Sequence, residues 1–389
     1  MSTRIFAVAA LASTSALAAT PLKLAGNFAG QDFFTGFRVN TSAIDTFNQG
    51  NIHYVDSATA MSGSNPLAFV NSAGNVVLRA DNTTNDPNPG PESTFGRNTV
   101  MMISNNPIDV GTLLVANLVH IPFGCSVWPA FWTLDASTET DVGGEIDIIE
   151  TVNLQTQNQY SLHTRSGCTL SNSTSFPHTG TVLQTNCDGV DFNVTGNQGC
   201  VTEEPAQNSG GPGFAGGAYA MYLSTDGVQF WFFPTSSIPS DLQSNSPDPT
   251  SWPTPSASYP ASSCDPSTFF SPQEVIFDID ICGVFAGAPA VFNATCPNMG
   301  SCLDLVGTAS NYNNAYWEIN YVKTFTASGA QASGTGSSSA SGSAASATGT
   351  SGSSSSSGNG SGAVALELGS KGVLAVIGTM LAGALALVL

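Results

Sequence analysis

The apolar residues of this chain recur at every second position in short segments, and no window repeats them with the 3.6-residue period of an amphipathic helix. Such alternation buries one face of an extended segment, so these segments are expected to be β-strands. The clearest single strands are residues 75–79, 111–119, 274–282 and 315–325. Residues 219–233 read as a hairpin, because two apolar runs flank Asp226-Gly227, a preferred two-residue turn. Many short strands joined by turns predict an all-β fold, either a sandwich or a barrel.

The charge composition excludes several classes of protein. The 389 residues include 8 Lys or Arg and 27 Asp or Glu, which gives a formal net charge of −19. So few basic residues argue against binding to nucleic acid, which depends on clustered Lys and Arg, and against docking on anionic lipid through a basic face. Charged residues make up 9% of the chain, against about 25% in an average protein, so helices with a charged outer face are expected to be scarce.

Residues 1–18 resemble a secretory signal peptide. Arg4 supplies the positive start, residues 5–17 form a short apolar run, and Ala16-Leu17-Ala18 fits a cleavage site. The alternative is a core helix, but the run begins close to the N-terminus and ends in small residues. The run is also too short to cross a bilayer, so we expect the protein to be secreted and extracellular.

The C-terminal part of the chain predicts a stalk and an anchor. Residues 327–362 are Ser, Gly, Ala and Thr apart from Gln331 and Asn359, a composition that cannot fold and is typical of a flexible, O-glycosylated stalk. Residues 363–389 are expected to be a GPI-attachment signal that is removed on anchoring to the cell membrane or cell wall. The alternative is a single-pass helix of about 18 residues. Residues 19–326 then form one domain.

The cysteines agree with an extracellular location. The domain holds all eight, at positions 125, 168, 187, 200, 264, 282, 296 and 302. An even number in a secreted chain predicts up to four disulfides, although eight cysteines allow 105 pairings. No C-x2-C pair occurs and the four His are scattered, which argues against a zinc cluster. Six N-x-S/T glycosylation sequons agree with secretion, at Asn40, Asn82, Asn172, Asn193, Asn293 and Asn359.

The candidate chemistry lies in residues 145–150, with the sequence Glu-Ile-Asp-Ile-Ile-Glu. In a regular strand Glu145 and Asp147 face one side of the sheet, whereas Glu150, an odd number of positions after Glu145, faces the other side. A β-bulge near Ile148-Ile149 adds one residue and restores the face. We therefore expect a bulged strand that projects all three carboxylates together.

Carboxylates on one face repel one another, so at least one of them is expected to have a raised pKa. An ionised carboxylate beside a protonated one is the pair that retaining glycosidases use, at about 5–5.5 Å. The alternatives are a calcium site or a solvated strand face. Trp128, Trp132 and His163 flank the run in sequence, and indole rings stack on sugars. These flanking residues therefore favour a site that acts on a sugar over a calcium site or a solvated strand face.

The acidic run resembles the E-x-D-x-x-E signature of glycoside hydrolase family 16, in the bulged form of the laminarinase-type enzymes. The resemblance covers about residues 21–326, and the cysteine positions look like those of the fungal laminarinase branch. The segments that carry it are Asn51-Ile-His-Tyr-Val-Asp56, Leu78-Arg-Ala-Asp81, Gly124-Cys-Ser-Val-Trp-Pro-Ala-Phe-Trp132, Ser161-Leu-His-Thr164, Val228-Gln-Phe-Trp-Phe-Phe-Pro234 and Ala315-Tyr-Trp-Glu-Ile319.

This resemblance implies a concanavalin A-like β-jelly-roll sandwich with a concave substrate cleft. It implies a retaining endo-1,3(4)-β-glucanase whose partner is a β-glucan polysaccharide. No cofactor or metal is expected in the site; a structural calcium ion would be compatible with the surface Asp residues, but no loop specifies one. We expect a monomer. The implied roles are nucleophile for Glu145, assisting residue for Asp147, acid/base for Glu150, support for His163, and substrate binding for Trp128, Trp132 and Trp317.

One position departs from the family pattern. The family often shows C-G-x-W-A-G, whereas this chain has Phe285 in place of the tryptophan, which removes an N–H donor. Two other functions remain open at this point. The same residues support a cell-wall glucan transglycosylase, in which a sugar replaces water as the acceptor. A non-catalytic glucan-binding wall protein also fits the stalk, although the complete carboxylate triad argues against it.

Overall fold

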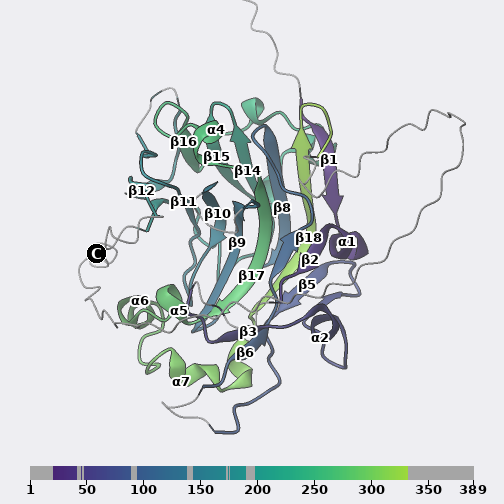
Figure 1. The fold of residues 1–389 in the computed structure, drawn as a ribbon, viewed down its shortest axis with the longest axis vertical. Helices are drawn as coiled ribbons and strands as arrows, with labels where there is room; N and C mark the ends of the chain where they lie inside the picture. Colours follow the sequence, from purple (N-terminus) through teal and green to yellow (C-terminus); the bar gives the residue numbers. More distant parts are fainter. Residues whose placement is uncertain are drawn as a thin grey trace, which may run out of the picture. The chain divides into compact units, whose positions relative to one another are not determined.

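Figure 1 shows the computed structural model, which describes residues 21–41, 45, 48–88, 94–137, 143–171, 174, 176–189 and 198–331. The described strands form two eight-stranded antiparallel sheets and one small parallel pair, β3 (Ile52–Tyr54) with β6 (Arg97–Thr99). Two facing antiparallel sheets around one core make a β-sandwich, so the predicted all-β class and the jelly-roll architecture are confirmed.

The first sheet takes strands from both ends of the domain, and β1 pairs with β18 beside its main path. In order, its strands are β16 (Ala257–Pro260), β15 (Gly227–Pro234), β14 (Gly217–Ser224), β8 (Thr112–His120), β18 (Tyr316–Thr326), β5 (Val76–Arg79) and β4 (Ala68–Val70), with β1 (Lys23–Phe28) on β18. The single strands expected at 75–79, 111–119 and 315–325 correspond to β5, β8 and β18 and are confirmed.

The second sheet holds the acidic run in its middle, and Figure 1 shows β9, β10, β11 and β17 side by side in this layer. In order, its strands are β12 (Thr181–Gln184), β13 (Cys200–Glu203), β11 (Gln159–His163), β10 (Glu145–Glu150), β9 (Val127–Asp135), β17 (Gln273–Ile281), β7 (Met102–Ser104) and β2 (Phe37–Val39). The strand expected at 274–282 corresponds to β17.

Helices are short, as the missing helical period and the scarcity of charges indicate. The longest described helix is α6, with 7 residues. The α-helices are α1 (Phe33–Gly36), α2 (Ser57–Met61), α3 (Ser240–Gln243), α4 (Pro266–Phe269), α5 (Gly283–Ala286), α6 (Pro289–Thr295) and α7 (Leu303–Val306). The 3-10 helices are η1 (Gly30–Asp32), η3 (Thr235–Ser237), η4 (Pro249–Ser251) and η5 (Ala309–Tyr312).

The turn of the predicted hairpin lies one residue earlier than expected. Ser224 of β14 pairs with Gly227 of β15, so Thr225 and Asp226 form the two-residue turn and Gly227 begins the strand. Gly227 has a φ of +145°, and a Cβ at this position would collide with the carbonyl oxygen of Tyr259. The glycine is therefore required by the neighbouring strand β16.

Buried aromatic rings join the two sheets. Phe131 and Phe277 of the second sheet stack with their ring centroids 4.3 Å apart, and Trp317 of the first sheet meets Phe277 edge-on at 5.3 Å. The Trp317 indole N–H also donates a hydrogen bond of 2.8 Å to the backbone carbonyl of Asp278. Trp317 thus ties the first sheet to the strand that borders the candidate site.

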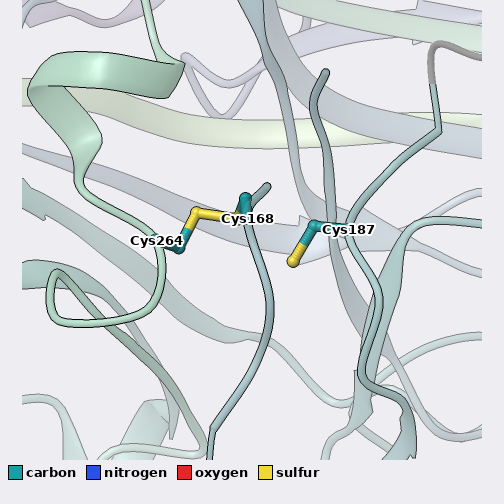
Figure 2. Close-up of side chains that lie close together, drawn as sticks. All are labelled: Cys168, Cys187 and Cys264. Atoms are coloured by element: carbon teal, nitrogen blue, oxygen red, sulfur yellow. A yellow bond between two sulfur atoms is a disulfide. The ribbon is translucent and has the colours of Figure 1, made fainter. Parts of the chain in front are cut away.

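Four disulfides are present, which confirms the number expected from eight cysteines. The pairs are Cys125–Cys296, Cys168–Cys264, Cys187–Cys200 and Cys282–Cys302. Two of them lie together: Figure 2 shows the sulfur of Cys187 beside the Cys168–Cys264 bond. Because every cysteine is paired, the loops that follow β8, β11, β12, β16 and β17 are crosslinked to the sandwich or to one another.

Several predicted features fall outside the described residues. These are the signal peptide at 1–18, the stalk beyond residue 331, the attachment signal at 363–389, and the sequons at Asn172, Asn193 and Asn359. Among the residues that the structure does describe, no helix has the length and apolar content needed to cross a membrane. The sequon at Asn293 lies in α6 and is exposed.

Phe277→Ala should lower the free energy of unfolding by about 3–5 kcal/mol, because it removes a fully buried ring that contacts both sheets and leaves a cavity. Urea unfolding followed by tryptophan fluorescence measures this change. Leu303→Ala is the matched control, since this side chain is 55% exposed and its loss should change stability by less than about 0.5 kcal/mol. Equal effects of both substitutions would contradict the core assignment.

Candidate active site

The acidic strand β10 contains the predicted bulge. Opposite β9, Asp147 pairs with Trp132 and Ile149 pairs with Phe131. β10 therefore has one extra residue, Ile148, between two positions that are consecutive in β9. Opposite β11, the register also shifts between Asp147 and Glu150. The extra residue brings Glu145, Asp147 and Glu150 to one face, and the three isoleucines between them are buried. The expectation from the sequence is therefore confirmed.

Neighbouring strands place the other predicted residues on the same face. His163 of β11 lies opposite Glu145, and Trp132 of β9 lies opposite Asp147. Trp128 is four residues before Trp132 in β9 and lies on the same face. The resulting pocket is lined by Asn48, Trp128, Ala130, Trp132, Glu145, Asp147, Glu150, Asp278 and Asp280.

His163 is the positive partner of the carboxylates. Its Nε2 lies 3.1 Å from Asp147 Oδ2 and 3.9 Å from Glu145 Oε1. Burial lowers the pKa of His163, but the hydrogen bond with Asp147 and the charges of Glu145, Asp147 and Glu150 outweigh it and raise the pKa to about 10. The imidazole is therefore protonated at neutral pH, and its positive charge lies beside the carboxyl groups of Glu145 and Asp147.

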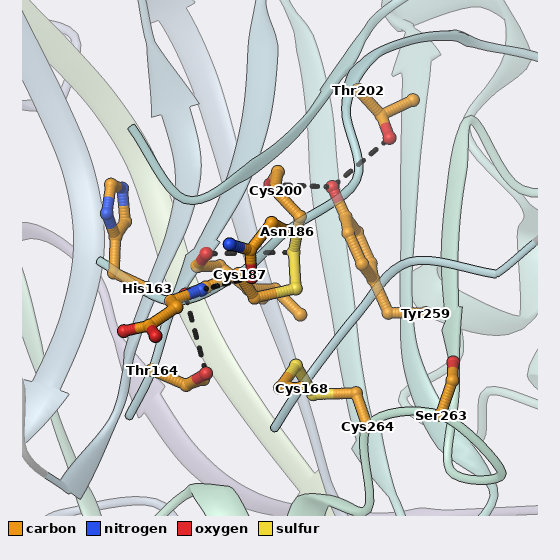
Figure 3. The surroundings of a disulfide bond; sticks show 12 residues. His163, Thr164, Cys168, Asn186, Cys187, Cys200, Thr202, Tyr259, Ser263 and Cys264 are labelled. Carbon is orange, nitrogen blue, oxygen red and sulfur yellow. Dashed lines mark hydrogen bonds between the residues drawn. A yellow bond between two sulfur atoms is a disulfide. The ribbon is translucent and has the colours of Figure 1, made fainter. Parts of the chain in front are cut away.

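A disulfide holds the loop beside His163 (Figure 3). Cys200 of β13 pairs with Leu162, and the carbonyl of Cys187 accepts a hydrogen bond of 2.8 Å from Thr164 N–H. A Cβ on Gly189 would lie 2.7 Å from His163 Nδ1. The Cys187–Cys200 bond thus joins two segments whose glycines, Gly189 and Gly199, lie close to the ring and restrict its orientation.

Glu150 has a raised pKa. Burial and the charge of Asp147 raise the pKa of Glu150 to about 7. Three interactions limit this rise. The Gln159 amide donates to Oε2 at 2.9 Å, His163 contributes its positive charge, and the Trp128 indole N–H donates to Oε1 at 3.1 Å. At mildly acidic pH the site therefore holds a protonated Glu150.

Two acidic residues of the pocket were not predicted from the sequence. Asp278 and Asp280 of β17 are buried and line the same pocket as the carboxylates of β10. Burial, opposed by a hydrogen bond from Tyr54 and helped by the charge of Asp45, raises the pKa of Asp278 to about 8. Two acids at alternate positions within the apolar run of residues 275–281 were a signal that could have found them.

The predicted sugar contact of Trp317 is wrong in this structure. The side chain is 0% exposed and packs between the sheets, so neither face of the indole is open to a ligand. The other two tryptophans line the pocket. Phe285, which stands where the family pattern has Trp, packs edge-on against Trp128 at 5.5 Å and is half-buried, so it supports the Trp128 ring.

Within the part of the chain that the structure describes, two groups of residues have the composition of metal ligands. Glu145, Asp147 and His163 bring their donor atoms within 4.8 Å of one another, but a protonated His163 has no lone pair to offer a cation. Cys168, Cys187 and Cys264 also lie together, but all three are in disulfides and carry no thiolate. Neither group fits a metal ion in this state.

Comparison with known proteins gives one consistent result. A family model described as the XgeA-like catalytic GH16 domain matches residues 39–325. A probable glycosidase of Schizosaccharomyces pombe is 38% identical over 307 residues, which are 78% of this chain and 68% of that protein. A probable endo-1,3(4)-β-glucanase of Aspergillus niger is 37% identical over 347 residues, 85% of this chain and 44% of that protein. The chain thus spans less than half of the length of the Aspergillus relative.

Two solved structures share the fold and about a third of the sequence. Laminarinase 16A of Phanerochaete chrysosporium, a GH16 enzyme with β-glucans in both donor and acceptor sites, is 35% identical with a TM-score of 0.70, and the match covers 78% of this chain and 99% of that one. An elongating GH family 16 β-1,3-glucosyltransferase is 34% identical with a TM-score of 0.68, covering 78% of this chain and 100% of that one.

Trp128→Phe should raise the pKa of Glu150 above its value of about 7, because it removes an N–H donor that stabilises the ionised carboxylate and keeps an aromatic ring. Carbon-13 NMR titration of labelled glutamate carboxyls measures this change. Trp252→Phe is the matched control, since it removes an indole donor from Asp241 outside the pocket. A Glu150 titration that stays near 7 or moves down would contradict the role of Trp128.

Proposed function

Because this chain belongs to glycoside hydrolase family 16, we propose that it is a retaining endo-β-glucanase that hydrolyses β-1,3-glucan or mixed β-1,3/1,4-glucan. The observation that carries the proposal is the bulged strand β10, which presents Glu145, Asp147 and Glu150 on one face and raises the pKa of Glu150 to about 7. The names of the similar proteins support the same substrate class, since they include an endo-1,3(4)-β-glucanase and a laminarinase.

The first step needs an ionised nucleophile and a proton for the leaving oxygen. Glu145 lies beside protonated His163 and is the nucleophile, which forms a bond to the anomeric carbon. Glu150, protonated below about pH 7, donates its proton to the glycosidic oxygen as the bond between that oxygen and the anomeric carbon breaks. The products are a shortened glucan with a free hydroxyl and a glycosyl ester on Glu145.

The second step reverses these roles. Glu150, now ionised, removes a proton from water while the water oxygen attacks the anomeric carbon and releases Glu145. Asp147 serves both steps, because its charge raises the pKa of Glu150 and its contact with His163 keeps the imidazole protonated. Since Glu150 must begin protonated, activity should fall as the pH rises through about 7.

Trp128 and Trp132 are the proposed sugar contacts. Both line the pocket beside the carboxylates, and indole rings offer apolar faces to pyranose rings and N–H donors to hydroxyls. The Trp132 indole N–H lowers the pKa of Asp278 but makes no hydrogen bond of ordinary geometry in the described structure, so we expect it to donate to a substrate hydroxyl. The Trp128 N–H already binds Glu150, so Trp128 contributes mainly its ring face and the alignment of the acid.

Glu150→Gln should lower kcat on β-1,3-glucan by roughly 10²–10⁴-fold, because no proton reaches the leaving oxygen. A laminaribiosyl fluoride needs no such proton, so this variant should still release a burst of fluoride. Glu145→Gln should lose both activities, because it lacks the nucleophile. Fluoride release and reducing-end assays measure the two reactions.

Glu318→Gln is the matched control for these variants. Glu318 lies in the first sheet, where it accepts hydrogen bonds from Asn71 and Asn75, so both activities should remain close to wild type. Near wild-type glucan hydrolysis by Glu145→Gln or Glu150→Gln would overturn the proposed roles.

Transglycosylation is the second candidate activity. The observation in its favour is the likeness to the elongating β-1,3-glucosyltransferase, which is nearly as strong as the likeness to the laminarinase. A sugar hydroxyl would then replace water in the second step with the same residues in the same roles. Products longer than a defined laminarioligosaccharide, seen by mass spectrometry from the first minutes, would support transfer. The complete set of site residues argues against a glucan-binding protein without activity.

We also propose that the enzyme is secreted and held at the cell surface by a GPI anchor. The motivation is the sequence of residues 1–18 and 327–389, together with four disulfides in the described domain. Anchoring should leave residues 372–389 absent from the mature protein, as tested by mass spectrometry of peptides. Detection of that segment in the mature protein would instead support the single-pass helix.

A further inference from the structure

The bulge in β10 has its own side-chain partner. Neither Ile148 nor Ile149 has a partner residue in β11, because the register passes directly from Asp147 to Glu150. Asn158, one residue before β11 begins, bridges this gap. Its Oδ1 accepts a hydrogen bond of 2.9 Å from the backbone N–H of Glu150, and its Nδ2 donates one of 2.9 Å to the backbone carbonyl of Ile148.

We propose that Asn158 is a positioning residue that holds the bulge and thereby keeps Glu150 on the same face as Glu145 and Asp147. Asn158 is absent from the pocket lining and bonds the backbone on both sides of residue 149. It therefore acts on the reaction through Glu150, and nothing in its position requires contact with the substrate.

Asn158 is itself firmly held. The residue is fully buried, its backbone N–H donates to Ser209 Oγ at 3.0 Å, and its backbone carbonyl accepts from Glu204 N–H at 2.9 Å. Glu204 in turn accepts a hydrogen bond from the Tyr160 hydroxyl at 2.6 Å. With its backbone fixed on both sides, the carboxamide presents one acceptor and one donor at set positions.

The same carboxamide also disfavours the competing register. A β10 without the bulge would pair regularly with β11, but the period of two would then turn Glu150 away from the face that carries Glu145. The bulge keeps Glu150 on the face of Glu145, but it leaves buried backbone N–H and C=O groups of β10 without their usual partners in β11. Asn158 supplies hydrogen-bond partners for two of these groups, so its loss should make the bulged conformation of β10 less stable.

Glu150 is thus held at two points by consecutive residues. Asn158 bonds its backbone, and Gln159 donates to its carboxylate. Glu145 comes before the bulge, and its register with His163 and Leu134 is regular. Loss of Asn158 should therefore misplace the acid and leave the nucleophile in position, which a general loss of structure would not do.

The test uses Asn158→Leu, which has a similar shape without hydrogen-bonding groups, and it rests on the proposed function for its kinetic part. Asn158→Leu should lower kcat on β-1,3-glucan by at least 100-fold with KM within threefold, because Trp128 and Trp132 lie on β9 and are unaffected. It should keep the burst of fluoride release from laminaribiosyl fluoride, as Glu150→Gln does. Asn158→Ser, whose hydroxyl can form a hydrogen bond with one of the two backbone groups, should have an intermediate kcat. If the leucine variant does not fold, the same kinetic measurements are made on the serine variant.

A measurement without substrate separates this inference from the proposed function. The Glu150 carboxyl, followed by carbon-13 NMR, should titrate near 7 in the wild type and closer to 4.5 in Asn158→Leu, because a released Glu150 is more exposed and farther from Asp147. This shift would support the positioning role even if the wild type cleaved no glucan. Asn71→Leu is the control, since it removes bonds to Ala73, Asn75 and Glu318 in the first sheet and should leave kcat and the titration unchanged.

Three results would overturn the inference. The first is a folded Asn158→Leu with wild-type kcat and a Glu150 titration near 7. The second is an equal loss of glucan and fluoride activities, because that indicates general damage to the site. The third is the same kinetic defect in Asn71→Leu, because any lost side-chain bridge in the sandwich would then suffice.

Discussion

One extra residue in β10 sets the direction of Glu150 and, with it, the chemistry of the pocket. Without the bulge at Ile148-Ile149, Glu150 would point toward the interior, where a carboxyl among isoleucine and phenylalanine side chains would have few partners. With it, three carboxylates share one face while the isoleucines of the strand remain in the core. The sandwich supplies what this arrangement needs, because β9 and β11 flank β10 and carry the tryptophans and His163.

The balance of charge in the pocket follows from this placement. Its lining includes five acidic residues and no Lys or Arg, and the protonated imidazole of His163 lies against two of them. One cation does not neutralise so many carboxylates, and burial penalises each ionised group further. Protons remain on Glu150 and Asp278, whose pKa values rise to about 7 and about 8, and burial also raises the pKa of Asp280 well above its usual range. A general acid at neutral pH is thus a consequence of crowding and burial.

Local patterns predicted much of the fold and the site. Alternation identified β5, β8, β17 and β18, and parity identified the bulge, because both depend on neighbouring residues alone. The burial of Trp317 depends on which face of β18 meets the second sheet, which is decided by pairing with β8 and β5. The disulfide pairing likewise depends on segments up to 171 residues apart. The carboxamide of Asn158 binds backbone groups, and such bonds leave no side-chain pattern in the sequence.

Proton NMR of the enzyme with a soluble β-1,3-glucan, recorded from the first minutes, tests the central claim most directly. A nucleophile and an acid on one face of a bulged strand act by two displacements, so the new reducing ends should appear first as the β-anomer and then equilibrate. Early α-anomeric ends would contradict the account, because inversion needs carboxyl groups about 6.5–9.5 Å apart with water between them and no glycosyl ester on Glu145.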